Sequence, residues 1–271
     1  MKVDSGGVTL DVEVHGEGRP VVLVHGFPDT KRLWSKQVPA LVDAGFQVVT
    51  YDQRGYGASD KPAGVDDYAI PFLALDATAI LDHLGLERAH LVGHDWGAAV
   101  VWATAALAPD RVDHLVAMSV GHPSAFADMN MTQREKSWYM LLFQFAPQAE
   151  QWLTVDDGAN FREWSHHPDF DAVFAELQAD ESLTPGLNYY RANVTPDALV
   201  GPPLELPPIL SPTMGIWSSG DFALTESQMT GSSAFCANGW RYERIDGPGH
   251  WMQWEAPDEV NRLLVDFLPA G

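Results

Sequence analysis

The sequence contains a single cysteine, Cys236, among its 271 residues. One thiol cannot form an internal disulfide, and such sparing use of cysteine is typical of a reducing cytoplasm. The chain also lacks a run of about 18 apolar residues, which a transmembrane helix requires. Its first residues, "MKVDSGGVTLDVEV", contain no basic segment followed by an apolar stretch, so a secretory signal is not indicated. We therefore expect a cytoplasmic protein without a membrane partner.

Basic residues are scarce in this chain. It has 16 lysines and arginines against 37 aspartates and glutamates, which gives a formal net charge of −21. Such a surface repels nucleic acid and anionic membranes, so we expect neither as a partner. The acidic residues are spread along the whole chain, which favours a solubilising surface over a recognition patch. With 46% hydrophobic residues, the chain can form one globular domain with a large core.

Short β-like runs alternate with helical stretches in the first half of the chain. Strands are predicted at 8–14, 20–26, 46–52, 89–95 and 112–120, and helices near 31–43, 71–84 and 97–107. This alternation predicts an α/β fold, with a mostly parallel sheet and helices on both faces.

A helical, aromatic-rich segment interrupts this alternation from about residue 122 to residue 208, and the proline cluster "GPPLELPPILSP" (201–212) closes it. Two strands and a final helix are expected after it, at 213–221, 240–249 and 257–268. We therefore predict a core domain made of residues 1–121 and 209–271, with residues 122–208 inserted as a helical cap.

The stretch "LVGHDWGAAVVW" (91–102) has the spacing of a nucleophile turn between a strand and a helix. In the pattern Gly-x-Ser-x-Gly, the strained backbone and the close packing of strand against helix require small neighbours. Gly93 and Gly97 occupy the glycine positions here, but Asp95 occupies the middle one. A carboxylate is already ionised near neutral pH and can displace a leaving group from an sp³ carbon, whereas serine serves acyl carbons. Asp95 therefore predicts attack on an alkyl carbon and an ester intermediate.

The partners of this nucleophile are predicted from their order along the chain. In this fold the order is nucleophile, acid, histidine, and Asp221 in "SSGD" and His250 in "GPGH" each follow a predicted strand. We expect His250, oriented by Asp221, to activate the water that hydrolyses the ester. The loop "HGFP" predicts an oxyanion hole made by the backbone N–H groups of Phe27 and Trp96.

Several segments together resemble the epoxide hydrolases of the α/β-hydrolase superfamily over nearly the full length of the chain. They are "HGFP" (25–28), "YDQRGYGASD" (51–60), "GHDWGA" (93–98), "SSGDFAL" (218–224) and "GPGHWMQWE" (247–255). The resemblance implies an α/β-hydrolase fold, addition of water to a small apolar epoxide to give a vicinal diol, and no cofactor or metal. It leaves the oligomeric state open, a homodimer included. Haloalkane dehalogenases share the carboxylate at the turn, so these segments alone do not identify the leaving group.

Epoxide opening produces an alkoxide that needs a proton donor, and the family is known for two cap tyrosines in this role. The segment "SWYMLLFQFAPQAE" (137–150) resembles the one that carries the first, which assigns Tyr139. The segment "LNYYRANV" (187–194) resembles the one that carries the second, where a Tyr-Arg pair is typical, which assigns Tyr190. A tyrosine can donate at neutral pH because its pKa is near 10. The plainer interpretation is that both residues pack in the cap.

Two alternatives to an epoxide hydrolase remain. A haloalkane dehalogenase would hold a halide with N–H donors, a role that fits Trp96, but this tryptophan is common to both families. Phe27 stands where many of these dehalogenases have an asparagine donor. The other alternative is a receptor that binds a small apolar ligand without catalysis, and the complete set of nucleophile, acid and base argues against it.

We expect the pocket wall to include Trp138, Phe143 and Trp152.

The sequence contains further histidines for which we expect no direct catalytic role. In "SHHPD" (165–169) the two adjacent histidines point apart and no third ligand is evident, so we expect a surface loop. His94, beside the nucleophile, is expected to support the turn. His122 follows the strand where some relatives place the acid, but no carboxylate lies next to it, which favours Asp221.

Overall fold

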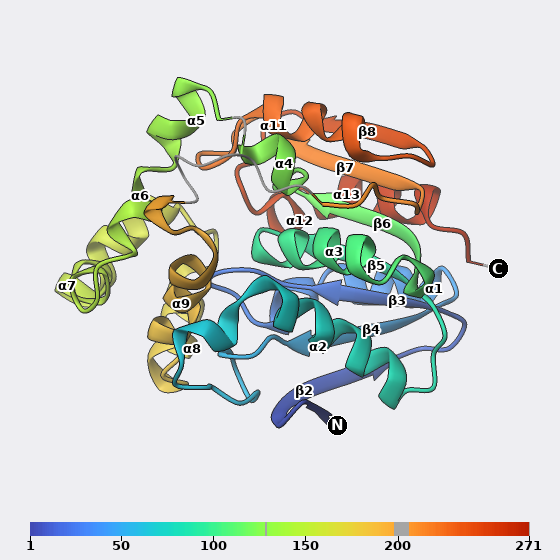
Figure 1. The fold of residues 1–271 in the computed structure, drawn as a ribbon, viewed down its shortest axis with the longest axis horizontal. Coiled ribbons are helices and arrows are strands. Elements are labelled where there is room, and N and C mark those ends of the chain that lie inside the picture. Colours follow the sequence, from blue (N-terminus) through green and yellow to red (C-terminus); the bar gives the residue numbers. More distant parts are fainter. Residues whose placement is uncertain (128, 198–205, 271) are drawn as a thin grey trace.

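The protein was analysed as a computed structural model, which describes residues 1–127, 129–197 and 206–270. An eight-stranded sheet with the strand order β1-β2-β4-β3-β5-β6-β7-β8 forms its centre (Figure 1). The strands are β1 (Lys2–Ser5), β2 (Val8–His15), β3 (Arg19–Val24), β4 (Phe46–Asp52), β5 (Ala89–His94), β6 (Val112–Met118), β7 (Thr213–Ser218) and β8 (Trp240–Ile245). Only the β1–β2 and β2–β4 pairs of these strands are antiparallel. The predicted mostly parallel α/β sheet is confirmed.

Helices cover both faces of the sheet. α2 (Ile70–His83) and α3 (Trp96–Leu107) pack on one face, and α1 (Gln37–Asp43) and α13 (Pro257–Phe267) pack on the other (Figure 1). Parallel neighbours need such crossover helices, and α3 supplies the one between β5 and β6.

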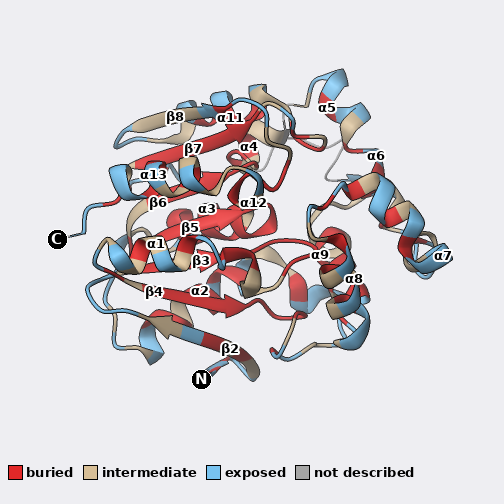
Figure 2. Cartoon of the chain, turned by 180° about the vertical axis from the view of Figure 1, so that it is seen from behind, coloured by how far each residue is buried: buried red, intermediate tan, exposed pale blue. Residues whose placement is uncertain are grey.

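The core consists of two apolar clusters, one on each face of the sheet. Val22 and Leu91 belong to the cluster under α2 and α3, whereas their neighbours Val21 and Val92 belong to the other. This alternation follows the two-residue period of a strand. Because both faces are covered, the middle strands are buried along most of their length and their sequences are mostly apolar (Figure 2).

The chain runs through a series of helices between β6 and β7. They are α4 (Pro123–Ala127), α5 (Met131–Lys136), α6 (Trp138–Leu142), α7 (Gln148–Ser165), α8 (Phe170–Ala179) and α9 (Leu183–Asn193). In Figure 1, α6 to α9 gather beyond one end of the sheet. We call residues 122–208 the cap segment; the division into a core of 1–121 and 209–271 and this cap stays a prediction. Residues 201–205 of the proline cluster lie outside the described residues.

The other helices are short. They are η1 (Lys31–Trp34), η2 (Val65–Tyr68), η3 (Pro109–Arg111), α11 (Glu226–Gly231), η4 (Ser232–Phe235) and α12 (Met252–Glu255). The strand predicted to end at residue 120 ends at Met118, because Ser119 has a positive φ of 67°. In the described part of the chain, no helix combines the length and the apolar character needed to cross a membrane.

Candidate active site

Asp95 lies on the turn between β5 and α3, with φ of 55° and ψ of −121°. A positive φ is unfavourable for a residue with a Cβ atom and costs about 1–3 kcal/mol at such sites. The turn is also tightly packed, since a Cβ on Gly97 would lie 2.0 Å from the carbonyl oxygen of Val24. This close approach explains the glycine. The turn holds the carboxylate just beyond the carboxyl end of β5.

One carboxylate oxygen of Asp95 is held by the loop that follows β3. The backbone N–H of Phe27 donates a 2.8 Å hydrogen bond to its Oδ1. A Cβ on Gly26 would lie 2.4 Å from this oxygen and 2.7 Å from the backbone nitrogen of Trp96. Gly26 therefore leaves open the space between Oδ1 and the N–H of Trp96. Both backbone N–H groups of the predicted oxyanion hole thus lie close to Asp95.

His250 lies between two carboxylates. Its Nδ1 is 2.9 Å from Oδ2 of Asp221, and its Nε2 is 3.6 Å from Oδ2 of Asp95. Asp221 is fixed in turn, because its Oδ1 accepts the backbone N–H groups of Ala223 and Leu224 at 2.8 and 2.9 Å. The structure thus brings together the three side chains that the sequence predicts as a triad.

The two carboxylates determine the protonation of His250. Burial lowers the pKa of its imidazole, but the charges of Asp221 and Asp95 and their hydrogen bonds outweigh burial and raise this pKa to about 10. Burial raises the pKa of Asp221, yet the charge of His250 and the hydrogen bonds to its carboxylate lower this pKa overall. The unreacted site therefore holds a protonated His250 between its two anions.

His94 packs behind the triad. Its Nε2 lies 2.9 Å from the carbonyl oxygen of His250, and the two ring centroids are 4.6 Å apart. Burial, followed by the charge of His250, lowers the pKa of His94 to about 4. A neutral ring at this position contacts the backbone of His250 without adding charge. The other assigned histidine, His122, stacks on Phe235 and has no part in this contact.

Tyr139 of α6 and Tyr190 of α9 line the same cavity as Asp95 and His250. Their ring centroids are 6.0 Å apart. Burial, followed by the negative charge of Asp95, raises the pKa of both phenols well above the ordinary value of 10. Both hydroxyls therefore stay protonated at physiological pH, as proton donors must.

The chain is similar to known proteins in both sequence and structure. A family profile described as the alpha/beta hydrolase fold matches residues 19–257. The chain is 34% identical to epoxide hydrolase A of Mycobacterium tuberculosis, over 98% of this chain and 96% of that protein. It is 31% identical to an epoxide hydrolase of Caballeronia sordidicola, over 98% and 92% of the two chains. The crystal structure of a Bacillus megaterium epoxide hydrolase with an inhibitor matches with a TM-score of 0.90 and 28% identity, over 98% of this chain and 99% of that chain.

The chain belongs to the epoxide hydrolase family of α/β hydrolases. Within this family member, the adjacent tyrosines of α9 have separate places: Tyr190 lines the cavity, whereas Tyr189 donates a 2.7 Å hydrogen bond to the carbonyl oxygen of Arg54. Tyr189 is therefore a contact between the cap segment and the core.

The cavity of this epoxide hydrolase family member is narrow. Its volume is about 10 Å³, close to the least that holds one water molecule. Besides Asp95, His250 and the two tyrosines, it is lined by Phe27, Pro28, Trp164, Ser165, Phe222, Ala223 and Trp251. Most of these side chains are apolar, so the wall is suited to apolar groups.

The three predicted wall residues do not line this cavity. Phe143 is fully buried and packs against the ring of Tyr190, with centroids 5.0 Å apart, and so lies behind the wall. Trp138 is 46% exposed and packs against Trp152. Since successive helical residues point about 100° apart, Trp138 points away when its neighbour Tyr139 points inward.

Trp164 and Phe222 provide the aromatic wall in their place. Phe222 directly follows the acid Asp221, so the "SSGDFAL" motif could have indicated it. Trp164 stands near the end of α7, in a segment with many aromatic residues, and nothing in the sequence separated it from Trp138 or Trp152.

A buried polar contact joins the cap segment to the core beside the cavity. Oδ1 of Asp29 lies 3.2 Å from Nε2 of His167, and its Oδ2 accepts a 2.9 Å hydrogen bond from Nε1 of Trp251. Burial raises the pKa of Asp29, but the charge of His167 and these hydrogen bonds lower it overall. The surface-loop prediction for residues 165–169 is right for the exposed His166 and wrong for His167, because the latter points at a buried carboxylate.

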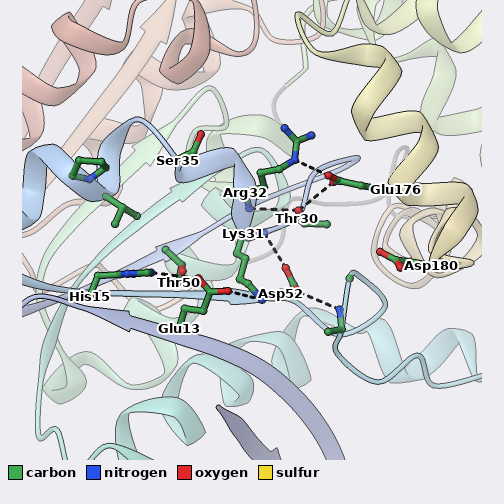
Figure 3. A pocket seen from close by; sticks show the side chains of 14 residues that line it. Glu13, His15, Thr30, Lys31, Arg32, Ser35, Thr50, Asp52, Glu176 and Asp180 are labelled. Carbon is green, nitrogen blue, oxygen red and sulfur yellow. Dashed lines mark hydrogen bonds and ion pairs between the residues drawn. The ribbon is translucent and has the colours of Figure 1, made fainter.

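A larger cleft, of about 620 Å³, lies elsewhere, between η1, the β2 and β4 strands and α8 (Figure 3). Its cations are already paired: Lys31 contacts Asp52 at 3.1 Å, and Arg32 contacts Glu176 at 2.7 Å. None of the triad residues lines it. Over residues 1–127, 129–197 and 206–270, no group of three or more histidine, cysteine or acidic side chains could hold a metal ion.

Proposed function

We propose that the protein adds water to an epoxide to give a vicinal diol, through a covalent ester on Asp95. The observation that carries this proposal is the arrangement of the two oxygens of Asp95. Oδ1 is held by the N–H of Phe27, and Oδ2 faces His250 beside the cavity that Tyr139 and Tyr190 line. The site thus pairs a carboxylate nucleophile with proton donors for the leaving oxygen.

The first step forms the ester. Oδ2 of Asp95 attacks a ring carbon from the side opposite the ring oxygen, the carbon–oxygen bond breaks, and the electron pair goes to that oxygen. Tyr139 or Tyr190 gives its proton to the oxygen, which becomes the first hydroxyl of the product. The raised pKa of both phenols supports this role, because it keeps their protons in place until the strongly basic alkoxide forms.

The second step hydrolyses the ester. Alkylation removes the negative charge of Asp95, which is one of the charges that raise the pKa of His250, so the imidazole loses its proton more easily. Neutral His250 takes a proton from water, and the hydroxide attacks the carbonyl carbon of the ester. Oδ1 becomes the oxyanion, for which the N–H groups of Phe27 and Trp96 are the donors.

Collapse of this intermediate releases the second product hydroxyl, which takes the proton from His250. The proton of the regenerated carboxyl group then returns to the tyrosinate, and His250 regains from solvent the proton that it gave to solvent before the second step. Atoms and charges therefore balance: one epoxide and one water give one diol, and the enzyme returns to its starting state. The diol keeps Oδ2 of Asp95, and the oxygen of the water stays in the carboxylate.

A single turnover in H₂¹⁸O tests this path. With enzyme in excess over 1,2-epoxyoctane, the diol should carry ordinary oxygen, and the peptide that contains Asp95 should carry one ¹⁸O atom in place of one ¹⁶O atom. Direct attack of water on the epoxide predicts the opposite distribution, which would overturn the ester mechanism.

A variant that blocks the second step separates the three hypotheses about function. His250→Gln should accumulate an alkyl adduct on Asp95 when it is incubated with epoxides. An adduct from chloroalkanes alone, with halide release, would instead establish the dehalogenase, and no turnover by the wild-type chain of any epoxide or chloroalkane in the panel would favour the non-catalytic receptor.

A further inference from the structure

Trp164 lines the active-site cavity and carries a buried indole N–H group that no described residue uses. Its ring lies beside the proton donor Tyr139, with centroids 4.7 Å apart, and faces Phe222 at 5.7 Å. Its Nε1 is fully buried, and no acceptor within the described part of the chain contacts it. Buried indole N–H groups normally have a partner, because an unpaired one loses its hydrogen bond to water on folding.

The other polar groups of the cavity wall already have protein partners. Nε1 of Trp251 donates to Asp29, Oγ of Ser165 accepts the backbone N–H of His167, and His250 is held by Asp221. Asp95, Tyr139 and Tyr190 have roles in the proposed reaction, and the remainder of the wall besides Trp164 is aromatic or aliphatic. Among the indole N–H groups of the cavity wall, that of Trp164 has no assignment in the protein or in the reaction.

We propose that Nε1 of Trp164 binds an oxygen on the substrate that is not the ring oxygen, and so selects epoxides with an ether oxygen next to the ring. This inference rests on the proposed function. The ring oxygen is already served by Tyr139 and Tyr190, so a third donor needs another acceptor. Because the ring of Trp164 packs directly on the ring of Tyr139, we place that acceptor near the epoxide ring. A glycidyl ether, in which one CH₂ group separates the ether oxygen from the ring, meets this requirement.

Two substrates of equal length isolate this contact. Butyl glycidyl ether and 1,2-epoxyoctane have the same number of chain atoms, and they differ by an oxygen in place of a CH₂ group. The ratio of their kcat/KM values measures the preference for the ether. The inductive effect of the oxygen on the ring is the same for every enzyme variant, so it cancels when ratios are compared between variants.

Trp164→Phe keeps an aromatic ring and removes the donor. We expect it to lower the ether preference by about 2- to 10-fold, the range of a single neutral hydrogen bond. Trp138→Phe is the matched control: it makes the same change at a partly exposed tryptophan that does not line the cavity, and it should leave the ratio unchanged. Thermal unfolding of each variant checks that the fold is retained.

A second substitution tests the same contact in case Trp164→Phe does not fold. Incorporation of β-(3-benzothienyl)alanine at position 164 preserves the shape of the indole and replaces only its N–H by sulfur, so the same drop in ratio is expected. If diol forms from both substrates and the ratio does not change on either replacement, the role of Trp164 is wrong while the proposed function stands. If the wild-type chain forms diol from neither substrate, the proposed function fails and this inference fails with it.

Discussion

Nε2 of His167 lies 3.2 Å from Oδ1 of Asp29, and this contact ties the cap segment to the loop that carries Phe27. Both side chains are buried, and the second oxygen of Asp29 is bound to Trp251, the residue after the triad histidine. The carboxylate of Asp29 thus joins three parts of the chain: its own loop, which carries Phe27, the cap segment, and the loop that carries His250.

Replacement of His167 should destabilise the protein more than replacement of its neighbour. His167→Ala leaves a buried carboxylate with one partner fewer, and we expect the free energy of unfolding to fall by about 2–3 kcal/mol. His166→Ala changes an exposed side chain and should stay within about 0.5 kcal/mol of the wild type. Urea denaturation followed by tryptophan fluorescence measures both. Equal stability of the two variants would mean that the Asp29–His167 contact contributes nothing.

Loss of both tyrosine hydroxyls should slow ring opening strongly. Tyr139→Phe and Tyr190→Phe together remove the proton donors, and we expect the rate of ester formation to fall about 100-fold or more, in the range of general acid catalysis. Each single substitution should cost less, because the other phenol remains. Stopped-flow measurement of the alkylation step gives these rates. Tyr189→Phe is the control, since its hydroxyl binds Arg54 away from the cavity; a double variant with the rate of this control would contradict the assignment.

The pH dependence of ester hydrolysis should report the protonation of His250. In the unreacted enzyme the pKa of His250 is raised to about 10, so the ring is charged through the neutral range. The hydrolysis step needs the neutral ring, so its rate should rise with pH. Its midpoint should lie below 10, because the ester no longer carries the charge of Asp95 that stabilises the imidazolium. Single-turnover rates over a pH series, set beside an NMR titration of His250 in the unreacted enzyme, measure the two midpoints; identical midpoints would contradict the role of Asp95.

Most of the fold follows from local sequence patterns. The strands β3, β5 and β7 are mostly apolar, and their burial on both faces is what such sequences predict. The edge strand β1 was not predicted. It has four residues, Lys2–Ser5, and it is held by pairing with β2, a contact that its own short sequence does not encode.

Whether a site residue could be predicted from the sequence depended on which part of the fold determines its position. Asp95, Asp221 and His250 follow strand ends, and a parallel sheet brings those ends together whatever the details of packing. The cavity wall depends instead on how the helices of the cap segment rotate against the core. Because of this rotation, Trp164 packs against Tyr139 whereas Trp138 packs against Trp152. The sequence of a single segment does not predict side-chain packing of this kind.

The narrowness of the cavity has a kinetic consequence. The cavity has room for about one water molecule, so side chains of its wall must move before an epoxide can enter. The frequency of that movement then sets a ceiling on kcat/KM that does not depend on how reactive the epoxide ring is. Differences between epoxides are expressed only below this ceiling, after the substrate has displaced the side chains that fill the empty site.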